Sequence, residues 1–542
     1  MDRLVFLLLF IAAFGSNAVS QGYRQAGSTS PRVAIGIVVE NMRPDYVDRY
    51  WDKFGDGGFR KLYNRGTVYQ GFTISQHILN NATGMATLYT GSYPSVHGII
   101  DENWYDREKE KVVNCVEDEK TGSVGTLKKS AGSSPGMLKT ITLGDRLKLY
   151  YNGKAKVFSV ALNDEAAVFA SGFSGDGAWW FDPESGHMVS GSWYCTSLPA
   201  WVTRFNEKES ARKYSSRNWV LLRSYADYTE STADKATPEK GYGPGMNSFP
   251  HNLGNLVKAA GNLSPLKTTP FANTMVKEFA LELMKNEGLG KDEATDLLTV
   301  VFSSMDYENG SFGPASVEME DLYLRLDLEI EELLNFAERE FGKDGFLVYL
   351  TANSSSSYPV EYLKENFRIP AGNFTPESAV ALLNSYLNIT YGDLRWISYN
   401  NGLQLYLDHK IIELNKIGLH EIREKSAAFL SQFEGIRKAV PAHLAGEGHL
   451  TDQSLGKLGN SYVESRSGDI LLVLQEGWQP AYKSRKSNYA GETHLPLVFY
   501  GTGIPSRILS FPCDASGFAS TVAAFLKIPL PGNPCREVSG DQ

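Results

Sequence analysis

Residues 80–98 read NNATGMATLYTGSYPSVHG, the form of a nucleophile turn that leads into a helix. The position where a nucleophile is expected holds Asn81. Its carboxamide has no proton that it can release, and it forms no covalent ester. Thr83 carries a hydroxyl, but two positions on a helix correspond to a rotation of about 200°, so Thr83 is predicted to point away from the direction of Asn81. We interpret Asn81 and Thr83 as part of a helix cap.

Further polar side chains stand at a few separate places in the chain, namely 40–41, 163–165, 305–310, 353–354 and around His494. Oxygen donors of the kind that Ca²⁺ and Mg²⁺ prefer are present at Glu40, Asp306, Glu308 and Asn353. The favoured interpretation is that these side chains are solvated or hydrogen-bonded without a metal.

These places follow stretches that predict buried strands. Residues 32–40 form a continuous β-branched run, which is typical of a strand buried on both faces of a parallel sheet. Similar runs predict strands at 155–162, 296–304, 345–353, 469–477 and 495–501, and helices are predicted at 82–91 and 316–341. The alternation predicts an α/β fold, a three-layer α/β/α sandwich around a mostly parallel sheet. Ligands of such sheets bind at the carboxyl ends of the strands.

Two longer stretches, at about 170–270 and 358–450, are predicted to be insertions that form a cap beside the sheet. The first contains the aromatic runs AWWF (178–181) and SWYC (192–195). Such rings could stack on a sugar or a nucleobase. The favoured interpretation is that they form the insertion's own small core.

The net charge of -9 gives no basic surface for nucleic acid, so nucleic acid is excluded as an expected partner. The expected partner is an unidentified small molecule or protein at the cleft or cap, and a monomer is favoured. No stretch after the N-terminal region approaches the roughly twenty apolar residues of a membrane span, so no transmembrane segment is expected.

The N-terminus predicts export. Residues 1–20 have the pattern of a secretory signal peptide, with an N-terminal membrane anchor as the alternative. A flexible lead-in (21–31), a main domain (32–535) and a short tail (536–542) follow, and the expected location is periplasmic or extracellular. The even number of cysteines fits disulfides in such a compartment. One possibility is a disulfide between Cys513 and Cys535 and another between Cys115 and Cys195. The alternative is that the cysteines are free, buried thiols.

The wording and order of several segments resemble the alkaline phosphatase superfamily. These segments are VVENMRPDYV, YTGSYPSVHGI, SSMDYENGSFGPASVEMEDLYLRLD, FLVYLTAN, SRSGDILLVLQEGW and ETHLPLVFYGTGI. The chain is most similar to the bacterial monomeric alkaline phosphatases related to nucleotide pyrophosphatase/phosphodiesterases. The resemblance runs from about residue 32 to the end.

The resemblance implies a site with two zinc ions and a Thr nucleophile. The family's ligands are an Asp after the first strand, the Asp and His of DYxGH, an Asp-His pair after a later strand and the His of THxPL. The corresponding positions, with the nucleophile second, are Glu40, Asn81, Asp306, Gly310, Asn353, Ser354 and His494. Only Asp306 and His494 keep the family's residue. Because catalytic zinc usually requires three protein ligands, we expect no cofactor, or at most one weakly bound divalent cation held by Asp306, His494 or Glu40.

The positions that contact phosphate in the family differ as well. The Lys and Arg of the family's LKDR stretch correspond to Asn163 and Glu165. An Asn of the family corresponds to Glu102. Because Asn103 is the next residue, an alignment shifted by one residue stays open as the alternative. Replacing Arg by Glu turns an anion clamp into repulsion.

Together these replacements predict an exported pseudoenzyme, a catalytically inactive protein with a binding or scaffold role and no identifiable catalytic residue. The alternative is an active hydrolase of phosphate or sulfate esters, a phosphomonoesterase or phosphodiesterase with a rebuilt one-metal site.

Overall fold

In the computed structural model, the apolar run near the N-terminus forms strand β1 (Val33–Glu40), and every residue of this strand is buried. β1 pairs in parallel with β12 (Asp296–Ser303) on one side and β13 (Phe346–Thr351) on the other. A strand in this position has no exposed face or edge, which is why its sequence is apolar without alternation.

The structure describes residues 30–126, 131–236, 239, 241–243, 245–304, 312–446, 455–481 and 493–535. The predicted signal peptide (1–20), most of the lead-in and the tail (536–542) lie outside these ranges. Asp306, Glu308 and Gly310 lie outside them too, so their predicted roles stay predictions.

The central sheet has eleven strands in the order β21-β2-β20-β13-β1-β12-β7-β8-β9-β5-β6. The middle, from β13 to β8 (Gly177–Asp182) through β7 (Val157–Ala161), is parallel. Antiparallel strands flank it, namely β20 (Leu497–Gly501) on one side and β9 (His187–Gly191) on the other. The strand predicted at 495–501 therefore exists but runs against its neighbours. The remaining strands are β2 (Thr67–Thr73), β5 (Glu117–Val124), β6 (Ala131–Ser133) and β21 (Arg507–Asp514).

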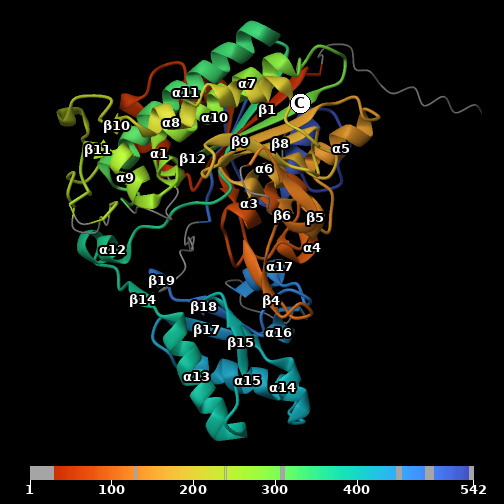
Figure 1. Ribbon diagram of the computed structural model, residues 1–542, viewed down its shortest axis with the longest axis vertical. Coiled ribbons are helices and arrows are strands. Elements are labelled where there is room, and N and C mark those ends of the chain that lie inside the picture. The colour runs from red at the N-terminus through yellow and green to blue at the C-terminus, as the bar shows by residue number, and fades with distance from the viewer. Residues whose placement is uncertain are drawn as a thin grey trace, which may run out of the picture.

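Helices cover both faces of this sheet, as the three-layer prediction requires. α10 (Pro270–Asn286) and α11 (Val317–Phe341) lie together on one side (Figure 1). α3 (Asn81–Thr90) and α6 (Asp164–Ser171) pack on the other side, where Tyr89 of α3 contacts Thr299 of β12 through their hydroxyls at 2.7 Å. The polar ends of the strands thus open between two helix layers.

The aromatic run at 178–181 belongs to the central sheet and not to a cap, which corrects the prediction for this segment. It forms β8, parallel to β7. The ring of Trp179 is buried and packs at 6.1 Å from that of Trp201 and 5.8 Å from that of Phe279 on α10. Large aromatic rings can cover a sheet face or fill a small core, so composition alone did not distinguish the two places.

A second, smaller sheet unit consists of β15 (Ile397–Asn400), β16 (Gln404–Leu407), β18 (Ile470–Leu474) and β17 (Ile436–Pro441), with α13 (Pro376–Tyr391), α14 (His409–Leu414) and α15 (Leu419–Leu430). It lies beside the central sheet, below it in Figure 1. Its own buried cluster includes Leu383, Trp396 and Leu430. β18 was predicted to continue the α/β alternation, but it pairs here with antiparallel partners.

The cysteines divide into a pair and two free thiols. Cys513 of β21 forms a disulfide with Cys535, which ties the described end of the chain to the sheet edge. Cys115 and Cys195 are not bonded to each other, so the prediction is confirmed for the first pair and the free-thiol alternative holds for the second. Within the described ranges, none of the helices has the length and apolar character needed to cross a membrane.

Candidate functional site

The carboxyl edge of the central strands brings together the first two site residues. Glu40 ends β1 and Ser303 ends β12, and the two are partners in register. Thr299, four residues before Ser303, faces Tyr89 of α3. Because side chains alternate along a strand, Ser303 and Glu40 project toward the same helix layer. Glu40 therefore lies where the resemblance places a metal-binding carboxylate.

Helix α3 begins at this edge with a reciprocal cap. Asn80 Oδ1 accepts from the amide of Thr83 at 3.1 Å, and Thr83 Oγ1 accepts from the amide of Asn80 at 3.1 Å. The predicted cap at Asn81 is thus wrong by one residue, since the extended backbone that a cap requires is at Asn80. Thr83 is fully buried, and its hydroxyl donates to the carbonyl of Ile78 at 3.0 Å. Thr83 therefore points away from the site, as predicted.

A glycine allows α3 to lie directly against the end of β13. A Cβ on Gly84 would stand 1.8 Å from the carbonyl oxygen of Asn353. The helix backbone thus rests on the backbone of Asn353. This contact brings Asn81, the first residue of the helix, beside Asn353, whose Nδ2 donates to Asn81 Oδ1 at 3.3 Å.

Neutral groups continue this hydrogen-bonded bridge toward β1. Ser354 Oγ lies 2.8 Å from Asn41 Oδ1 and 3.0 Å from Asn353 Oδ1. Asn353 and Ser354 are both buried, and Asn41 has the left-handed backbone, with φ of 57°. We call this set of Asn81, Asn353, Ser354 and Asn41 the amide bridge. It joins α3, β13 and β1.

The amide bridge does not fit a dinuclear zinc centre. Its amides and hydroxyl are weak, uncharged zinc ligands, and they bond to one another across the positions that the resemblance assigns to metal ligands. Across the described ranges, no group of three His, Cys, Asp or Glu side chains is placed to hold a metal ion. His494 forms an isolated bridge with Thr73 at the start of the β20 segment.

The N-terminus of α6 brings the former phosphate-contact positions into the same region. Asn163 precedes the helix, and Asp164 and Glu165 are its first residues. Burial, followed by the carboxylates of Asp164 and Glu102, raises the pKa of Glu165 well above its ordinary value, with a smaller contribution from Glu40. Burial, followed by the carboxylates of Glu165, Glu102 and Asp164, raises the pKa of the Cys115 thiol. Three predicted site residues therefore interact here as one acidic group.

One cation reaches this region that the sequence did not indicate. Lys267 Nζ donates to Asn163 Oδ1 at 2.6 Å. Lys267 belongs to a short 3-10 helix (Ser264–Thr268) that is 104 residues from Asn163 in the chain. No local pattern marks such a contact, because it depends on how a distant segment packs against α6.

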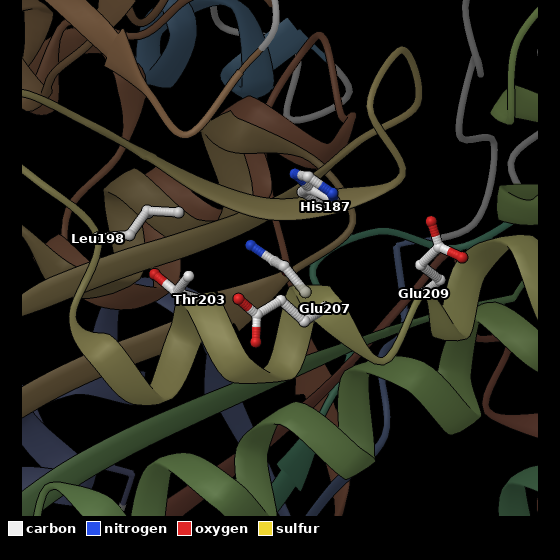
Figure 2. Close-up of a pocket in the computed structure, with 6 residues that line it drawn as sticks. His187, Leu198, Thr203, Glu207 and Glu209 are labelled. Carbon is white, nitrogen blue, oxygen red and sulfur yellow. The ribbon is translucent and has the colours of Figure 1, made fainter.

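A separate pocket of about 380 Å³ lies at β9 and α7 (Ala200–Glu207), as Figure 2 shows. It is lined by His187, Leu198, Thr203, Asn206, Glu207 and Glu209. Asn206 is already used, since it bonds the amide and the carbonyl of Met188 at 2.9 and 3.0 Å. None of the predicted site residues lines this pocket.

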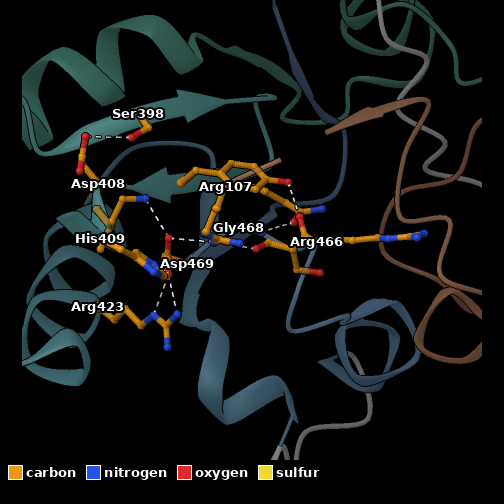
Figure 3. A network of polar contacts seen from close by, with 12 residues as sticks. Arg107, Ser398, Asp408, His409, Arg423, Arg466, Gly468 and Asp469 are labelled. Atoms are coloured by element: carbon orange, nitrogen blue, oxygen red, sulfur yellow. Dashed lines mark hydrogen bonds and ion pairs between the residues drawn. The ribbon is translucent and has the colours of Figure 1, made fainter. Parts of the chain in front are cut away.

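A polar network holds the smaller sheet unit to the main body (Figure 3). Asp469 is fully buried and accepts from Arg107 at 3.0 Å, from Arg423 Nε at 2.9 Å and from the amide of Leu407 at 2.8 Å. His409 Nε2 lies 2.9 Å away. Arg107 follows β3 (Asn103–Asp106) of the main body, whereas the other three belong to the smaller unit. The conspicuous RSGD stretch thus has a structural role.

Comparison with known proteins places these features in a family. The family model described as type I phosphodiesterase / nucleotide pyrophosphatase matches residues 34–496. The chain is 32% identical over 521 residues to alkaline phosphatase PafA of Elizabethkingia meningoseptica, covering 94% of this chain and 95% of PafA. It is also 32% identical over 515 residues to alkaline phosphatase PhoV of Synechococcus elongatus, covering 94% and 92% of the two chains.

The crystal structure of wild-type PafA matches with a TM-score of 0.88 at 31% identity, covering 95% of this chain and all of that one. The overall fold thus has a counterpart in a solved alkaline phosphatase. The chain belongs to the type I phosphodiesterase / nucleotide pyrophosphatase family, within the alkaline phosphatase superfamily.

Proposed function

We propose that this protein is a binding or scaffold member of its family that does not hydrolyse phosphate esters. The observation that carries the proposal is the bond between Asn353 Nδ2 and Asn81 Oδ1 at 3.3 Å. Asn81 stands at the start of α3, where the family's nucleophile is expected, and its carboxamide cannot form a phosphoryl ester. Its partner occupies a position expected to hold a charged metal ligand.

Charge supports the same proposal. A phosphate group that approached α6 would meet the carboxylates of Asp164 and Glu102, which already raise the pKa of Glu165 beside them. Bringing like charges close together in an interface costs roughly several kcal/mol of binding free energy. The family's anion clamp has no equivalent at Glu165.

An active hydrolase is the second candidate. It is supported by the similarity to alkaline phosphatases over nearly the whole chain, and by Lys267, whose ammonium lies beside Asn163. In this candidate Lys267 would replace the missing phosphate-binding cation, and water held by one metal would replace the nucleophile.

The test measures metal content and hydrolysis on the same sample. Protein purified without chelators is analysed for zinc, calcium and magnesium, and is then assayed with a phosphomonoester and a phosphodiester before and after zinc is added. We expect no stoichiometric metal and no turnover above that of Asn81→Ala. Dialysis against EDTA is expected to leave the unfolding temperature unchanged. Two zinc ions per chain, or turnover that His494→Ala abolishes, would establish the hydrolase instead.

Export is part of the proposal. Its support is the signal-peptide pattern of residues 1–20 together with the Cys513–Cys535 disulfide, a bond typical of oxidising compartments. Intact-mass measurement of the protein from periplasmic and extracellular fractions tests it. A chain that retains residues 1–20 with reduced Cys513 and Cys535 would contradict export.

A further inference from the structure

The pocket between β9 and α7 lies where strand β5 stops pairing with β9. β5 pairs with β9 at Ser190 and Gly191, which leaves the preceding edge of β9 to another partner. Asn206 of α7 is that partner, since its carboxamide bonds both the amide and the carbonyl of Met188. Asn206 lines the pocket and is only 7% exposed. Two hydrogen bonds and burial hold this side chain, so this wall of the pocket is formed before any ligand binds.

The pocket has an apolar end and an acidic end. A Cβ on Gly125, the residue after β5, would lie 2.8 Å from Leu198 Cδ1, so Leu198 packs against the chain where β5 ends. Figure 2 shows Leu198 at one end of the pocket and Glu209 at the other, with His187 of β9 between them. A ligand that fills the pocket therefore meets a hydrocarbon surface on one side and a carboxylate on the other.

The size of the pocket suits an organic molecule. Its volume of about 380 Å³ falls within the range of about 300–1,000 Å³ that is typical of small-molecule sites. A metal ion is not the expected occupant, because among the described residues no three His, Cys, Asp or Glu side chains are placed to hold one. The ionisable side chains of the lining border a space and do not gather around one point.

These ionisable side chains are not paired with the rest of the described chain. Across the residues that the structure describes, the carboxylates of Glu207 and Glu209 and the imidazole of His187 form no hydrogen bond or ion pair. Lys208 stands between the two glutamates in the sequence, but it pairs with Glu282 at 3.6 Å. The pocket therefore keeps the negative charge of both carboxylates.

The end of α7 disfavours these carboxylates and favours a cation. Glu207 is the last residue of α7, and Glu209 follows two residues later. The carbonyl groups at a helix C-terminus carry partial negative charge, which repels anions and attracts cations. Glu209 also has the left-handed backbone, with φ of 50°, which is uncommon for residues other than glycine. Neither carboxylate is placed to stabilise the fold, whereas a bound cation is attracted by both of them and by the helix end.

We infer that this pocket binds a small organic molecule that carries a protonated amine. In the bound state the ammonium group contacts Glu207 and Glu209 at the acidic end, and the carbon skeleton extends toward Leu198. The His187 imidazole and the Thr203 hydroxyl offer further hydrogen-bonding groups along the pocket. The inference goes beyond the proposed function, because none of these residues belongs to the candidate site at the strand ends.

The test is calorimetric titration of the full-length mature protein with two amines and their uncharged counterparts. The amines are 1,4-diaminobutane and glucosamine, and the counterparts are 1,4-butanediol and glucose. We expect at least one amine to bind one per chain and more tightly than its counterpart. Calcium chloride is titrated in parallel, and it is expected to bind more weakly than the amine because it has no carbon skeleton to contact Leu198.

Variants locate the binding. Glu207→Gln and Glu209→Gln are each expected to weaken it roughly fivefold, the effect of a favourable exposed ion pair, and having two variants keeps the test valid if one of them does not fold. Thr203→Phe keeps both carboxylates but fills the pocket with a ring, so it is expected to abolish binding. Thr203 is exposed on α7, so this change leaves the core untouched. Glu365→Gln, at an exposed position outside the pocket, is the matched control.

The outcomes separate the inference from the proposed function. The inference is overturned if neither amine binds more tightly than its uncharged counterpart, or if both glutamine variants bind as the native chain does. Binding that persists in Thr203→Phe would also overturn it, because attraction to surface charge alone would then explain the result. Weaker binding in both glutamine variants and loss of binding in Thr203→Phe support the inference. Turnover in the hydrolysis assay bears only on the proposed function, and it is read from a different measurement.

Discussion

At the scale of single residues, the amide bridge is the feature that most distinguishes this site from a phosphatase site. It consists of four neutral side chains from three elements that bond among themselves, and two of them, Asn353 and Ser354, stand where the resemblance places metal ligands. Neutral side chains hold the elements together without the cost of burying like charges. The integrity of the site is therefore expected to depend on these bonds and not on a metal.

A double-mutant cycle tests the link between Asn81 and Asn353. Asn353→Ala is expected to lower the free energy of unfolding by about 1–3 kcal/mol, because it leaves buried partners unsatisfied. Asn81→Ala should cost less, since Asn81 is half-buried. Urea unfolding of both single variants and the double variant should give a coupling energy of at least about 0.5 kcal/mol. Strict additivity would show that the 3.3 Å contact contributes nothing.

Elsewhere in the molecule, a buried pair makes stability depend on pH. His251 Nε2 lies 2.8 Å from Glu318 Oε1, and both side chains are buried. Burial raises the pKa of Glu318 to about 8 and lowers the pKa of His251 to about 4. Unfolded His251, with its ordinary pKa of 6.5, still takes up protons near pH 6.5 and offsets part of the Glu318 effect there, so Glu318 dominates the pH dependence of this pair toward pH 8.

The direction in which stability changes with pH follows from proton binding. Above pH 6.5 the folded state keeps the Glu318 proton that the unfolded state has lost, so stability falls as pH rises toward 8, by up to about 1.4 kcal/mol per pH unit for this group. Glu318→Gln should remove this slope and raise stability at pH 8 relative to the native chain. Urea unfolding at pH 6.5, 7.25 and 8 measures it, with exposed Glu365→Gln as control. Equal slopes for Glu318→Gln and the native chain would refute the assignment.

At the scale of elements, the position of α3 depends on one close backbone contact. Alanine is about 1 kcal/mol more favourable than glycine inside a helix, so Gly84 is retained against helix propensity. The reason is the carbonyl of Asn353, which leaves no room for a Cβ. A carbonyl of the main chain cannot rotate away as a side chain can, so the helix itself would have to move.

Gly84→Ala is therefore expected to destabilise the protein by about 1–3 kcal/mol, the usual cost of overpacking, despite the gain in helix propensity. The matched control is Gly456→Ala at the start of α17 (Gly456–Ser461), where a Cβ meets nothing within 4 Å. Thermal and urea unfolding compare the two. If Gly84→Ala proved as stable as Gly456→Ala, the contact between α3 and Asn353 would be looser than described.

At the scale of the whole molecule, Asp469 joins two bodies that have separate hydrophobic cores. Burial alone would raise the pKa of Asp469, but His409, Arg107 and Arg423 hold it below its ordinary value. The stabilisation is thus present above the ordinary pKa of 3.8 and is lost as pH falls below it. The junction between the two bodies is expected to be sensitive to acid.

Asp469→Asn should loosen this junction at neutral pH. Breaking a buried ion pair by removing one partner costs about 3–5 kcal/mol, because Arg107 and Arg423 remain with less compensation. Limited proteolysis should show faster cleavage between the main body and the smaller sheet unit. Asp393→Asn, at an exposed position in the same unit, is the control. Equal cleavage rates for the two variants would show that Asp469 does not hold the smaller sheet unit to the main body.

The sequence by itself determined the elements whose burial can be read locally. Continuous apolar runs predicted the strands β1, β12 and β13, and β1 was predicted to be buried on both faces. The long amphipathic period predicted α11. These inferences succeeded because each depends on the period of one segment, which reports the faces that it buries.

Only the tertiary structure decided which segments meet. Local period does not name a strand's partner, so β18 and β8 were assigned to the wrong sheet or layer and the reversed direction of β20 was missed. The contact between Lys267 and Asn163 spans 104 residues, and the fit of Gly84 against Asn353 joins segments that are even farther apart in the chain. Such contacts arise from packing between surfaces that are each built by different parts of the chain. For that reason the sequence predicted which strand ends carry the candidate site, and the fold decided how the side chains there are paired.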